Sequence, residues 1–150
     1  MRVYRLQGSR FPLINWKGAE VRGGRWNQIG TAMIYTSATM SLAALEILVH
    51  HNSIPIDFVG IEVRIPDDLR VSTPADLGLP VDWPEVLPTE VTAEYGSKWV
   101  AAAKTVALKI PSAVVPSEFN YLLNPNHRDF GSLHFRYTKI RFDSRLILTK

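Results

Sequence analysis

The regular alternation across residues 58–65 is the feature that most limits how this chain can fold. Every second residue from Val59 to Ile65 is aliphatic, and the residues between them are glycine or charged. Successive side chains of a β-strand point to opposite faces, so this pattern predicts a strand with one apolar face. The Pro-Asp-Asp sequence at residues 66–68 ends it.

Shorter patterns predict further elements on both sides of this strand. We expect strands over residues 2–6, 32–36, 113–115, 139–142 and 146–148, helices over 41–51 and 97–108, and loops over 11–27 and 117–131. Ser37 or Thr39 can cap the first helix, and Ser97 the second. Residues 72–96 carry four prolines and are expected to form a long surface excursion, either a lid, a partner surface or a plain connection. Strands outnumber helices without regular βαβ alternation, which favours an α+β fold over a doubly wound sheet.

Composition narrows the class of protein. The 150 residues fit one domain over 1–150. The chain has no cysteine, which excludes disulfides, cysteine zinc sites and thiol nucleophiles. The net charge of +3 is scattered, with no run of five cations, so it gives no sign of nucleic-acid binding. The start is unlike a signal peptide and no apolar run could span a bilayer, so we expect no membrane association and a cytoplasmic location.

Glu46 is isolated among aliphatic residues in the first expected helix. Leu42, Leu45 and Val49 fall on the same helical face. A carboxylate on an inward apolar face requires a partner, and such groups often mark functional clefts. The alternative is a structural pair with His50, four residues further on. His50 lies near Glu46 around the helix and is therefore also a candidate for the same pocket.

Residues 23–27, with the sequence Gly-Gly-Arg-Trp-Asn, form a candidate anion-binding turn. Paired glycines let the backbone approach a ligand closely, and the guanidinium of Arg25 matches phosphate oxygens. The alternative is an ordinary β-turn with a solvated arginine. Tyr35 follows in a predicted strand, where it either packs in the core or stacks on a ligand ring.

The segment from 115 to 127 is rich in hydroxyl, amide and turn residues. No Gly-x-Ser-x-Gly sequence surrounds Ser117, so a hydrolase triad is not expected there. Its plainer role is a hydrogen bond within a turn. His127, Asp129 and His134 have no recognised metal-ligand spacing, so we expect no metal.

Together these segments resemble the RES family, which is named for an arginine, a glutamate and a serine. Three blocks match in order: Gly23–Asn27 with Gly30-Thr31 and Tyr35–Ser37; Leu42–His50; and Pro116-Ser117 with Asn120–Pro125 and His127. The two ends of the chain, around Tyr4–Leu6 and Phe142–Leu146, also look like those of the family. The resemblance therefore covers essentially the whole chain.

The resemblance implies a fold like the catalytic core of ADP-ribosyltransferases: a split β core with flanking helices and a cleft for NAD. Family members act as toxins that deplete NAD or, in some cases, ADP-ribosylate a protein. Each is paired with an Xre-like helix-turn-helix antitoxin that blocks the cleft. The resemblance is also compatible with a homodimer inside a larger complex.

The resemblance, combined with residue chemistry, implies cleavage of the bond between nicotinamide and ribose, with NAD as the substrate. Glu46 would stabilise the positive charge that develops on the ribose. The remaining candidates would bind NAD: Arg5 and Arg25 at phosphate, Tyr35 at the nicotinamide half, Ser117 by a hydrogen bond, and His50 and Asn124 as further contacts.

Other functions remain open at this point. The acceptor could be water, inorganic phosphate or a protein side chain, because all three reactions use the same donor. A protein ADP-ribosyltransferase with one specific target is therefore the main alternative. A non-catalytic nucleic-acid-binding module ranks lower, because the cations do not cluster with aromatic residues.

Overall fold

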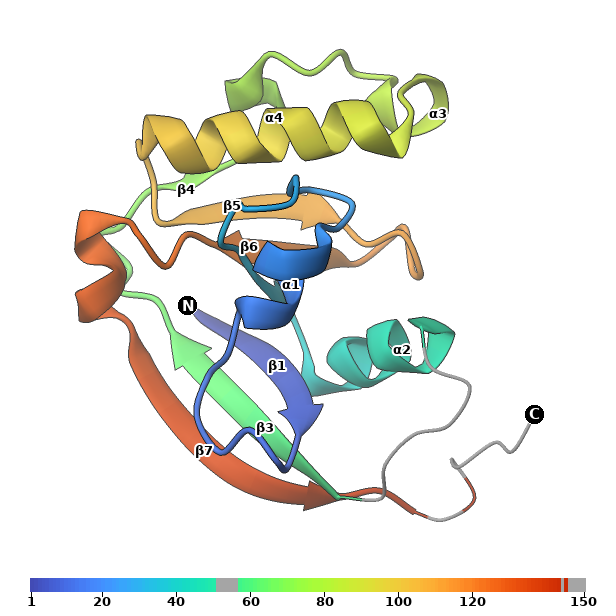
Figure 1. Cartoon of the computed structure of the whole chain (residues 1–150), viewed down its shortest axis with the longest axis vertical. Helices are drawn as coiled ribbons and strands as arrows, with labels where there is room; N and C mark the ends of the chain where they lie inside the picture. Colours follow the sequence, from blue (N-terminus) through green and yellow to red (C-terminus); the bar gives the residue numbers. More distant parts are fainter. Residues whose placement is uncertain (51–56, 144, 146–150) are drawn as a thin grey trace.

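The computed structural model describes residues 1–50, 57–143 and 145. In these residues, seven strands form one sheet in the order β4-β5-β6-β2-β1-β3-β7 (Figure 1). The strands are β1 (Arg2–Gly8), β2 (Ile34–Ser37), β3 (Asp57–Arg64), β4 (Val71–Ser72), β5 (Ala107–Pro111), β6 (Phe119–Leu123) and β7 (His134–Arg141). The helices are α1 (Lys17–Arg22), α2 (Met40–His50), α3 (Trp83–Val86) and α4 (Thr89–Ala102), with short 3₁₀ turns η1 (Pro74–Leu77) and η2 (Arg128–Ser132).

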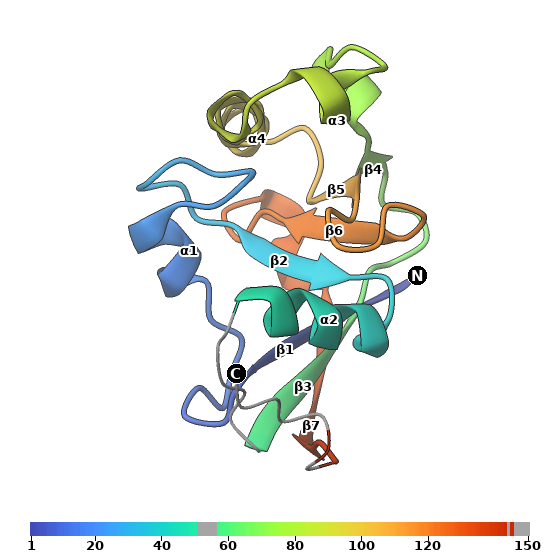
Figure 2. The same cartoon turned by 90° about the vertical axis from the view of Figure 1, so that its right-hand side faces the viewer.

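The sheet is split between β1 and β2. Strand β1 pairs with β3 along its whole length, from Arg2↔Arg64 to Gly8↔Phe58. It pairs with β2 only at Tyr4↔Ser37. The sheet therefore consists of two halves, β4-β5-β6-β2 and β1-β3-β7, which diverge from this single pair (Figure 2). This arrangement confirms the expected α+β fold with a split β core.

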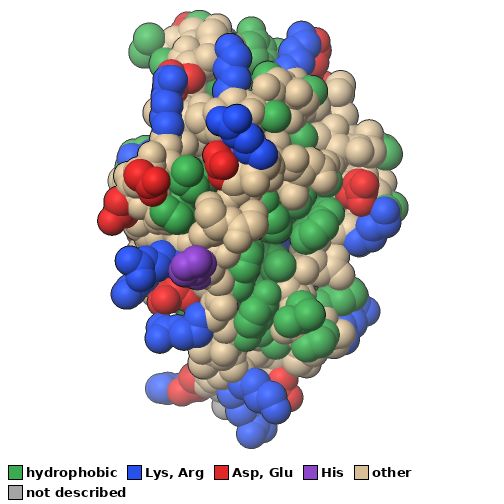
Figure 3. Space-filling view, turned by 90° about the vertical axis from the view of Figure 1, so that its left-hand side faces the viewer, with side chains coloured by type: hydrophobic (Ala, Val, Ile, Leu, Met, Phe, Trp, Pro, Cys, Tyr) green, Lys and Arg blue, Asp and Glu red, His purple; other side chains and the backbone are tan. Residues whose placement is uncertain are grey.

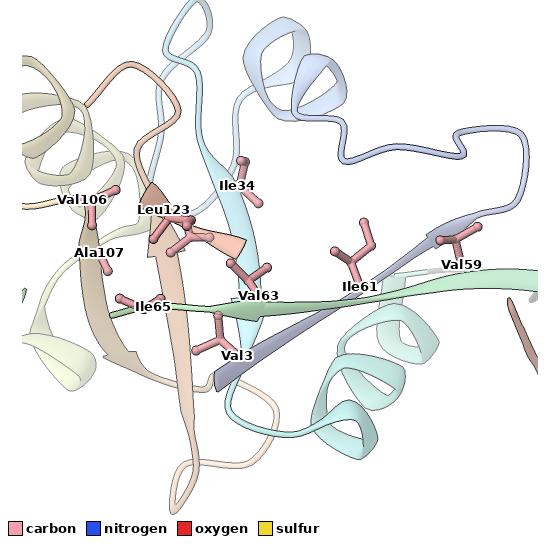
Figure 4. Close-up of a cluster of buried hydrophobic side chains, with 10 residues drawn as sticks. Val3, Ile34, Val59, Ile61, Val63, Ile65, Val106, Ala107 and Leu123 are labelled. Carbon is pink, nitrogen blue, oxygen red and sulfur yellow. The ribbon is translucent and has the colours of Figure 1, made fainter. Parts of the chain in front are cut away.

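The main hydrophobic core joins the two halves. Its buried members include the apolar face predicted for residues 58–65, together with residues of β1, β2, β5 and β6: Val3, Ile34, Val59, Ile61, Val63, Ile65, Val106, Ala107, Leu123 and Leu133 (Figure 4). The other face of β3 is also covered, because Phe58 packs with Leu6 and Ala43 beneath α2. The alternation thus identified the strand, while the cover over Phe58 comes from α2, the helix that precedes β3 in the chain.

A second core lies between α4 and the outer half of the sheet. Trp26, Leu79, Trp83 and Trp99 pack there against residues of β5 and β6. Trp26 and Trp83 meet edge to face, with ring centroids 5.1 Å apart. The proline-rich stretch over residues 72–96, expected to be a long surface excursion, is mostly exposed but contains more helix than expected, because it forms η1, α3 and the first part of α4. Leu79 and Trp83 of this stretch are buried in the second core, whereas Val81 and Val86 are exposed.

The second expected helix is displaced. Helix α4 begins at Thr89 and ends at Ala102, where Ala103 adopts a positive φ of 46°. Residues 107–111, expected to continue the helix in part, form strand β5 instead. Strand β5 has buried residues on both faces, with Lys109 as its one charged residue, so it gives no regular period-two signal.

The remaining expected helices, strands and loops agree with the structure in part. The expected strands at 2–6 and 32–36 match β1 and β2, and the helix at 41–51 matches α2 through His50, with Thr39 Oγ1 accepting from Leu42 N at 3.1 Å. The expected loops at 11–27 and 117–131 contain α1 and β6, the expected strand at 113–115 is a loop, and β7 begins earlier than 139. The strand expected at 146–148 lies outside the described residues. Within the described ranges, no helix is long and apolar enough to cross a membrane.

Candidate active site

A cleft of about 890 Å³ opens where the two halves of the sheet separate. Its walls come from β1, β2, α1, the turn after α1, α2 and the connection between β5 and β6. Five of the predicted site residues line it: Arg5, Arg25, Tyr35, Glu46 and His50. Segments far apart in the sequence therefore converge on one cleft.

A second hollow, of about 630 Å³, lies against β3 and β7. Pro12, Val59 and Tyr137 contribute its apolar lining, and Lys139 and Arg141 its cations. Figure 3 shows hydrophobic side chains gathered on the face that β7 borders. None of the predicted site residues, all of which fall in the described part of the chain, lines this hollow, so the cleft at the split is the candidate active site.

The carboxylate of Glu46 is fixed by two side chains from the other half of the sheet. Its Oε1 atom accepts hydrogen bonds from Ser112 Oγ at 2.7 Å and from Asn120 Nδ2 at 2.6 Å. Asn120 is itself oriented, because its Oδ1 accepts from Ser37 Oγ at 2.8 Å. Among the described residues, these partners take the place of the pair with His50 that the sequence had left open.

Ser112 is the hydroxyl that the structure brings to Glu46. It is buried just after β5, and its Oγ accepts hydrogen bonds from the backbone N–H groups of Val114 and Val115, each at 3.0 Å. Because the two N–H groups occupy its lone pairs, its single proton points to Glu46. The carboxylate is thus held by a donor that is itself locked in direction.

The apolar face of α2 differs from the one predicted. Leu42 is buried, but Leu45 is 42% exposed and Val49 is 58% exposed. The inward side of the helix is formed instead by Ala43 together with neighbouring residues that pack on β3. Glu46 therefore lies at the edge of the buried face, where it borders the cleft.

Arg5 spans the split in the sheet from strand β1. Its guanidinium donates to Tyr35 O at 2.9 Å, Asn15 O at 3.1 Å and Gln7 Oε1 at 3.3 Å. Burial lowers the pKa of Arg5 to about 10, so the side chain is still charged at neutral pH. All three acceptors are neutral, and no carboxylate in the described part of the chain pairs with Arg5. An uncompensated positive charge at the cleft attracts an anion.

The turn after α1 separates two neighbouring residues. Gly23 ends the helix with φ 73°, and Gly24 N donates to Asn27 O at 2.8 Å, which closes a tight turn over Arg25 and Trp26. Trp26 is 1% exposed and belongs to the second core, whereas Arg25 is exposed and lines the cleft. The side chain of Trp26 thus anchors the turn in the core, and the side chain of Arg25 is presented to a ligand.

Tyr35 braces this turn from the cleft side. Its hydroxyl donates to Asn27 Oδ1 at 2.7 Å and accepts from Trp26 N at 3.0 Å. Burial raises the pKa of Tyr35 to about 12, so the phenol is neutral at physiological pH. A Cβ atom at Gly24 would lie 2.6 Å from Tyr35 Oη, which explains the need for the second glycine.

Ser117 and Asn124 lie away from the cleft. Ser117 is exposed in the turn between Val115 and Glu118. Asn124 is completely buried, donates to Val100 O at 3.0 Å and accepts from Asn126 N at 3.0 Å, so it ties the end of β6 to α4. The structure therefore does not bring these two predicted contact residues to the cleft with the other five: Ser117 lies in a surface turn, and Asn124 links β6 to α4.

The sequence interpretation missed four residues that line or support the cleft: Arg22, Ser37, Ser112 and Asn120. Ser37 and Asn120 carried a signal, since they fall in the first and third blocks that resemble the RES family. Ser112 follows a strand that the sequence analysis did not predict and whose first two residues it placed in a helix, which hid the position of Ser112 opposite Glu46. Within the described residues, no group of His, Cys, Asp and Glu could hold a metal ion.

The split sheet and its cleft define an α+β domain with a charged site between the halves of the sheet. Residues 2–144 match the RES domain, and the chain belongs to the RES-domain family. It is 37% identical over 139 residues to the "Prs ADP-ribosylating toxin" of Sphingobium sp. strain YBL2. This alignment covers 87% of this chain and 84% of the relative. The chain is 36% identical over 156 residues to a protein named "Toxin Res" from Photorhabdus laumondii, which covers 100% and 99% of the two chains.

The fold is also found among solved structures. A chain in the crystal structure of the Mycobacterium tuberculosis MbcT–MbcA toxin–antitoxin complex superposes with a TM-score of 0.71. The match covers 97% of this chain and 85% of that chain at 15% sequence identity. This likeness supports the fold alone.

Proposed function

We propose that this protein is the toxin of a toxin–antitoxin pair and that it cleaves the bond between nicotinamide and ribose in NAD. Membership of the RES-domain family and the names of the relatives support the general role. The observation that carries the proposal is that the fixed carboxylate of Glu46 shares one cleft with the cations Arg5 and Arg25. A dinucleotide carries two matching features, a ribose that becomes positive and a diphosphate that is negative.

The volume of the cleft supports a ligand of this size. Small-molecule sites occupy about 300–1,000 Å³, and the cleft of about 890 Å³ falls near the upper end of this range. Arg25 and Arg5 would attract the diphosphate, and Tyr35 would lie against the nicotinamide half. His50 would contact the ligand from the end of α2.

Glu46 would act when the bond to ribose breaks. The bonding electrons leave with nicotinamide, which departs as a neutral molecule, and the ribose carbon becomes positive. A carboxylate that already points at this position stabilises the charge without having to reorient. Because Ser112 and Asn120 both bind Oε1, the second oxygen of Glu46 remains for the substrate.

The acceptor determines the product. Water would give hydrolysis, inorganic phosphate would give phosphorolysis, and in both cases the cell would lose NAD. Transfer to a protein side chain is the second candidate, favoured by the relative that is named an ADP-ribosylating toxin and is 37% identical to this chain. All three reactions use the same residues around the donor.

A toxin of this kind requires an inhibitor. We propose that an Xre-like helix-turn-helix antitoxin covers the cleft, supported by the toxin–antitoxin complex to which the fold is similar. The proposal also includes a single RES domain over residues 1–150, action in the cytoplasm and a homodimer within the complex. Size measurement of the co-expressed pair checks the assembly.

The experiment compares the purified protein with a Glu46→Gln variant and with Glu94→Gln as the matched control. Glu94 is exposed on α4, away from the cleft. With NAD in phosphate buffer, where water and inorganic phosphate are both available as acceptors, we expect free nicotinamide from the wild type and the control, and a loss of about 100-fold in Glu46→Gln. With labelled NAD and cell lysate, label on a protein band would identify transfer, and label only on ADP-ribose would identify degradation. Equal turnover in all three proteins would reject the role of Glu46.

A further inference from the structure

Helix α4 lies directly behind the turn that presents Arg25 (Figure 2). Thr92 is 1% exposed, and its Oγ1 donates a 2.7 Å hydrogen bond to Arg25 O. The same hydroxyl lies 2.9 Å from Thr89 O within the helix, so its one proton is shared between the two carbonyls. The backbone of the turn is thus bound to α4 at the residue whose side chain enters the cleft.

One turn further along α4, Gly96 meets the next residue of the same loop. A Cβ atom at Gly96 would overlap the carbonyl of Trp26, and its neighbouring Cα would lie at 3.2 Å. Close contact between the helix and the Trp26 backbone is therefore possible only because position 96 lacks a side chain. Any larger residue would push the loop away from α4.

A third contact completes this interface. Ser97 Oγ accepts a hydrogen bond from Gln28 N at 2.9 Å. Residues 92, 96 and 97 of α4 therefore contact the loop at 25, 26 and 28 in parallel order. Tyr35 holds the loop from the cleft side through Trp26 N, so the backbone is fixed on both sides.

From these contacts we infer that Thr92 and Gly96 are positioning residues that set where the Arg25 guanidinium lies, and hence how tightly the diphosphate of NAD binds. This inference rests on the proposed function. Neither residue is expected to touch the reacting ribose, because each acts through the backbone of the loop. Substitutions at these two positions should therefore weaken the binding of NAD, while the rate of the chemical step at Glu46 stays nearly unchanged.

The test measures kcat and KM for nicotinamide release in Thr92→Val, Thr92→Ser and Lys98→Ala, together with the melting temperature of each. Valine keeps the shape of threonine without the donor, and serine restores the donor. Lys98 lies on the exposed face of the same helix, paired with Glu94. We expect Thr92→Val to raise KM about fivefold, the effect of losing one hydrogen bond, with kcat nearly unchanged. Thr92→Ser and Lys98→Ala should retain the KM of the wild type.

A purely structural role would give a different pattern. Thr92→Val would then melt at a lower temperature but, at a temperature where it is folded, would have the KM of the wild type, and this result would overturn the inference while leaving the proposed function intact. Gly96→Ala provides a second variant, in which displacement of the loop should raise KM further than Thr92→Val does. A wild-type protein that neither binds nor cleaves NAD would overturn the proposed function, and the inference with it.

Discussion

Ser112 donates a 2.7 Å hydrogen bond to Glu46, although the two residues lie 66 positions apart in the chain. One belongs to the connection after β5 and the other to α2, so the bond closes over the split in the sheet. Both ends are fixed, since two backbone N–H groups orient the serine hydroxyl. We therefore expect the proposed activity to depend on Ser112 rather than on Ser117.

Ser112→Ala and Ser117→Ala form a matched pair that tests this assignment. Without the hydroxyl, Glu46 loses one of its two donors and two backbone N–H groups lose their acceptor. We expect nicotinamide release to fall at least about tenfold in Ser112→Ala, with a loss of about 1–3 kcal/mol in the free energy of unfolding. Ser117 is exposed, and its variant should match the wild type in both assays. A larger effect of Ser117→Ala on turnover would contradict the structural assignment.

Asn120→Asp tests the second donor to Glu46. The substitution keeps the shape of the side chain but replaces the amide N–H with a carboxylate oxygen, which would lie about as close to Glu46 Oε1 as the amide does, at 2.6 Å. Two carboxylates at this distance repel each other, and one of them takes up a proton. We expect turnover to fall by about tenfold or more at neutral pH. Asn126→Asp, at an exposed position outside the cleft, should have wild-type turnover.

These two bonds also mark the limit of prediction from sequence. Glu46 could be identified locally, because it is the lone acid among aliphatic residues of one helix, and the paired glycines marked the Arg25 turn. Ser112 and Asn120 reach Glu46 only because β5 and β6 pair with each other and β6 pairs with β2. That pairing is set by packing between distant segments. The helix expected over residues 97–108 overlapped the first two residues of β5, which hid the position of Ser112.

Arg5 gives the proposed activity a dependence on pH. Burial lowers its pKa to about 10, below that of the solvated side chain, so the folded chain releases this proton before the unfolded chain does. Burial of the cation therefore opposes folding below about pH 10, and this opposition fades as the pH rises toward the higher pKa of the unfolded chain. NAD binding should weaken over the same pH range, because the charge that attracts the diphosphate disappears as the pH rises past about 10. We expect KM for NAD to rise there.

Arg5→Lys is the control for this dependence. Lysine has an ordinary pKa of about 10.4, and burial at the same position would lower it further, so the rise in KM should move to lower pH. Tyr35, whose pKa is raised to about 12, stays neutral throughout this range. A rise at the same pH in both proteins would show that another group is responsible.

Gly24→Ala tests whether the turn requires its close contact with Tyr35. The added methyl would lie 2.6 Å from Tyr35 Oη and 2.9 Å from Asn27 Oδ1, so the loop or the phenol must move. We expect a loss of about 1–3 kcal/mol in the free energy of unfolding, measured with denaturant, and weaker NAD binding by calorimetry. Gly131→Ala should be neutral, since no atom lies within 4 Å of the added methyl. Equal stability of the two variants would mean that the turn adapts.

The close spacing of Arg25 and Trp26 has a consequence for how this loop can change over evolution. One residue points into the cleft and its immediate neighbour into the core, so the length of the loop matters as much as its composition. Deletion or insertion of a single residue would exchange the two directions, burying a guanidinium and exposing an indole. Homologous loops should therefore tolerate substitutions around this pair far more readily than any change in residue number.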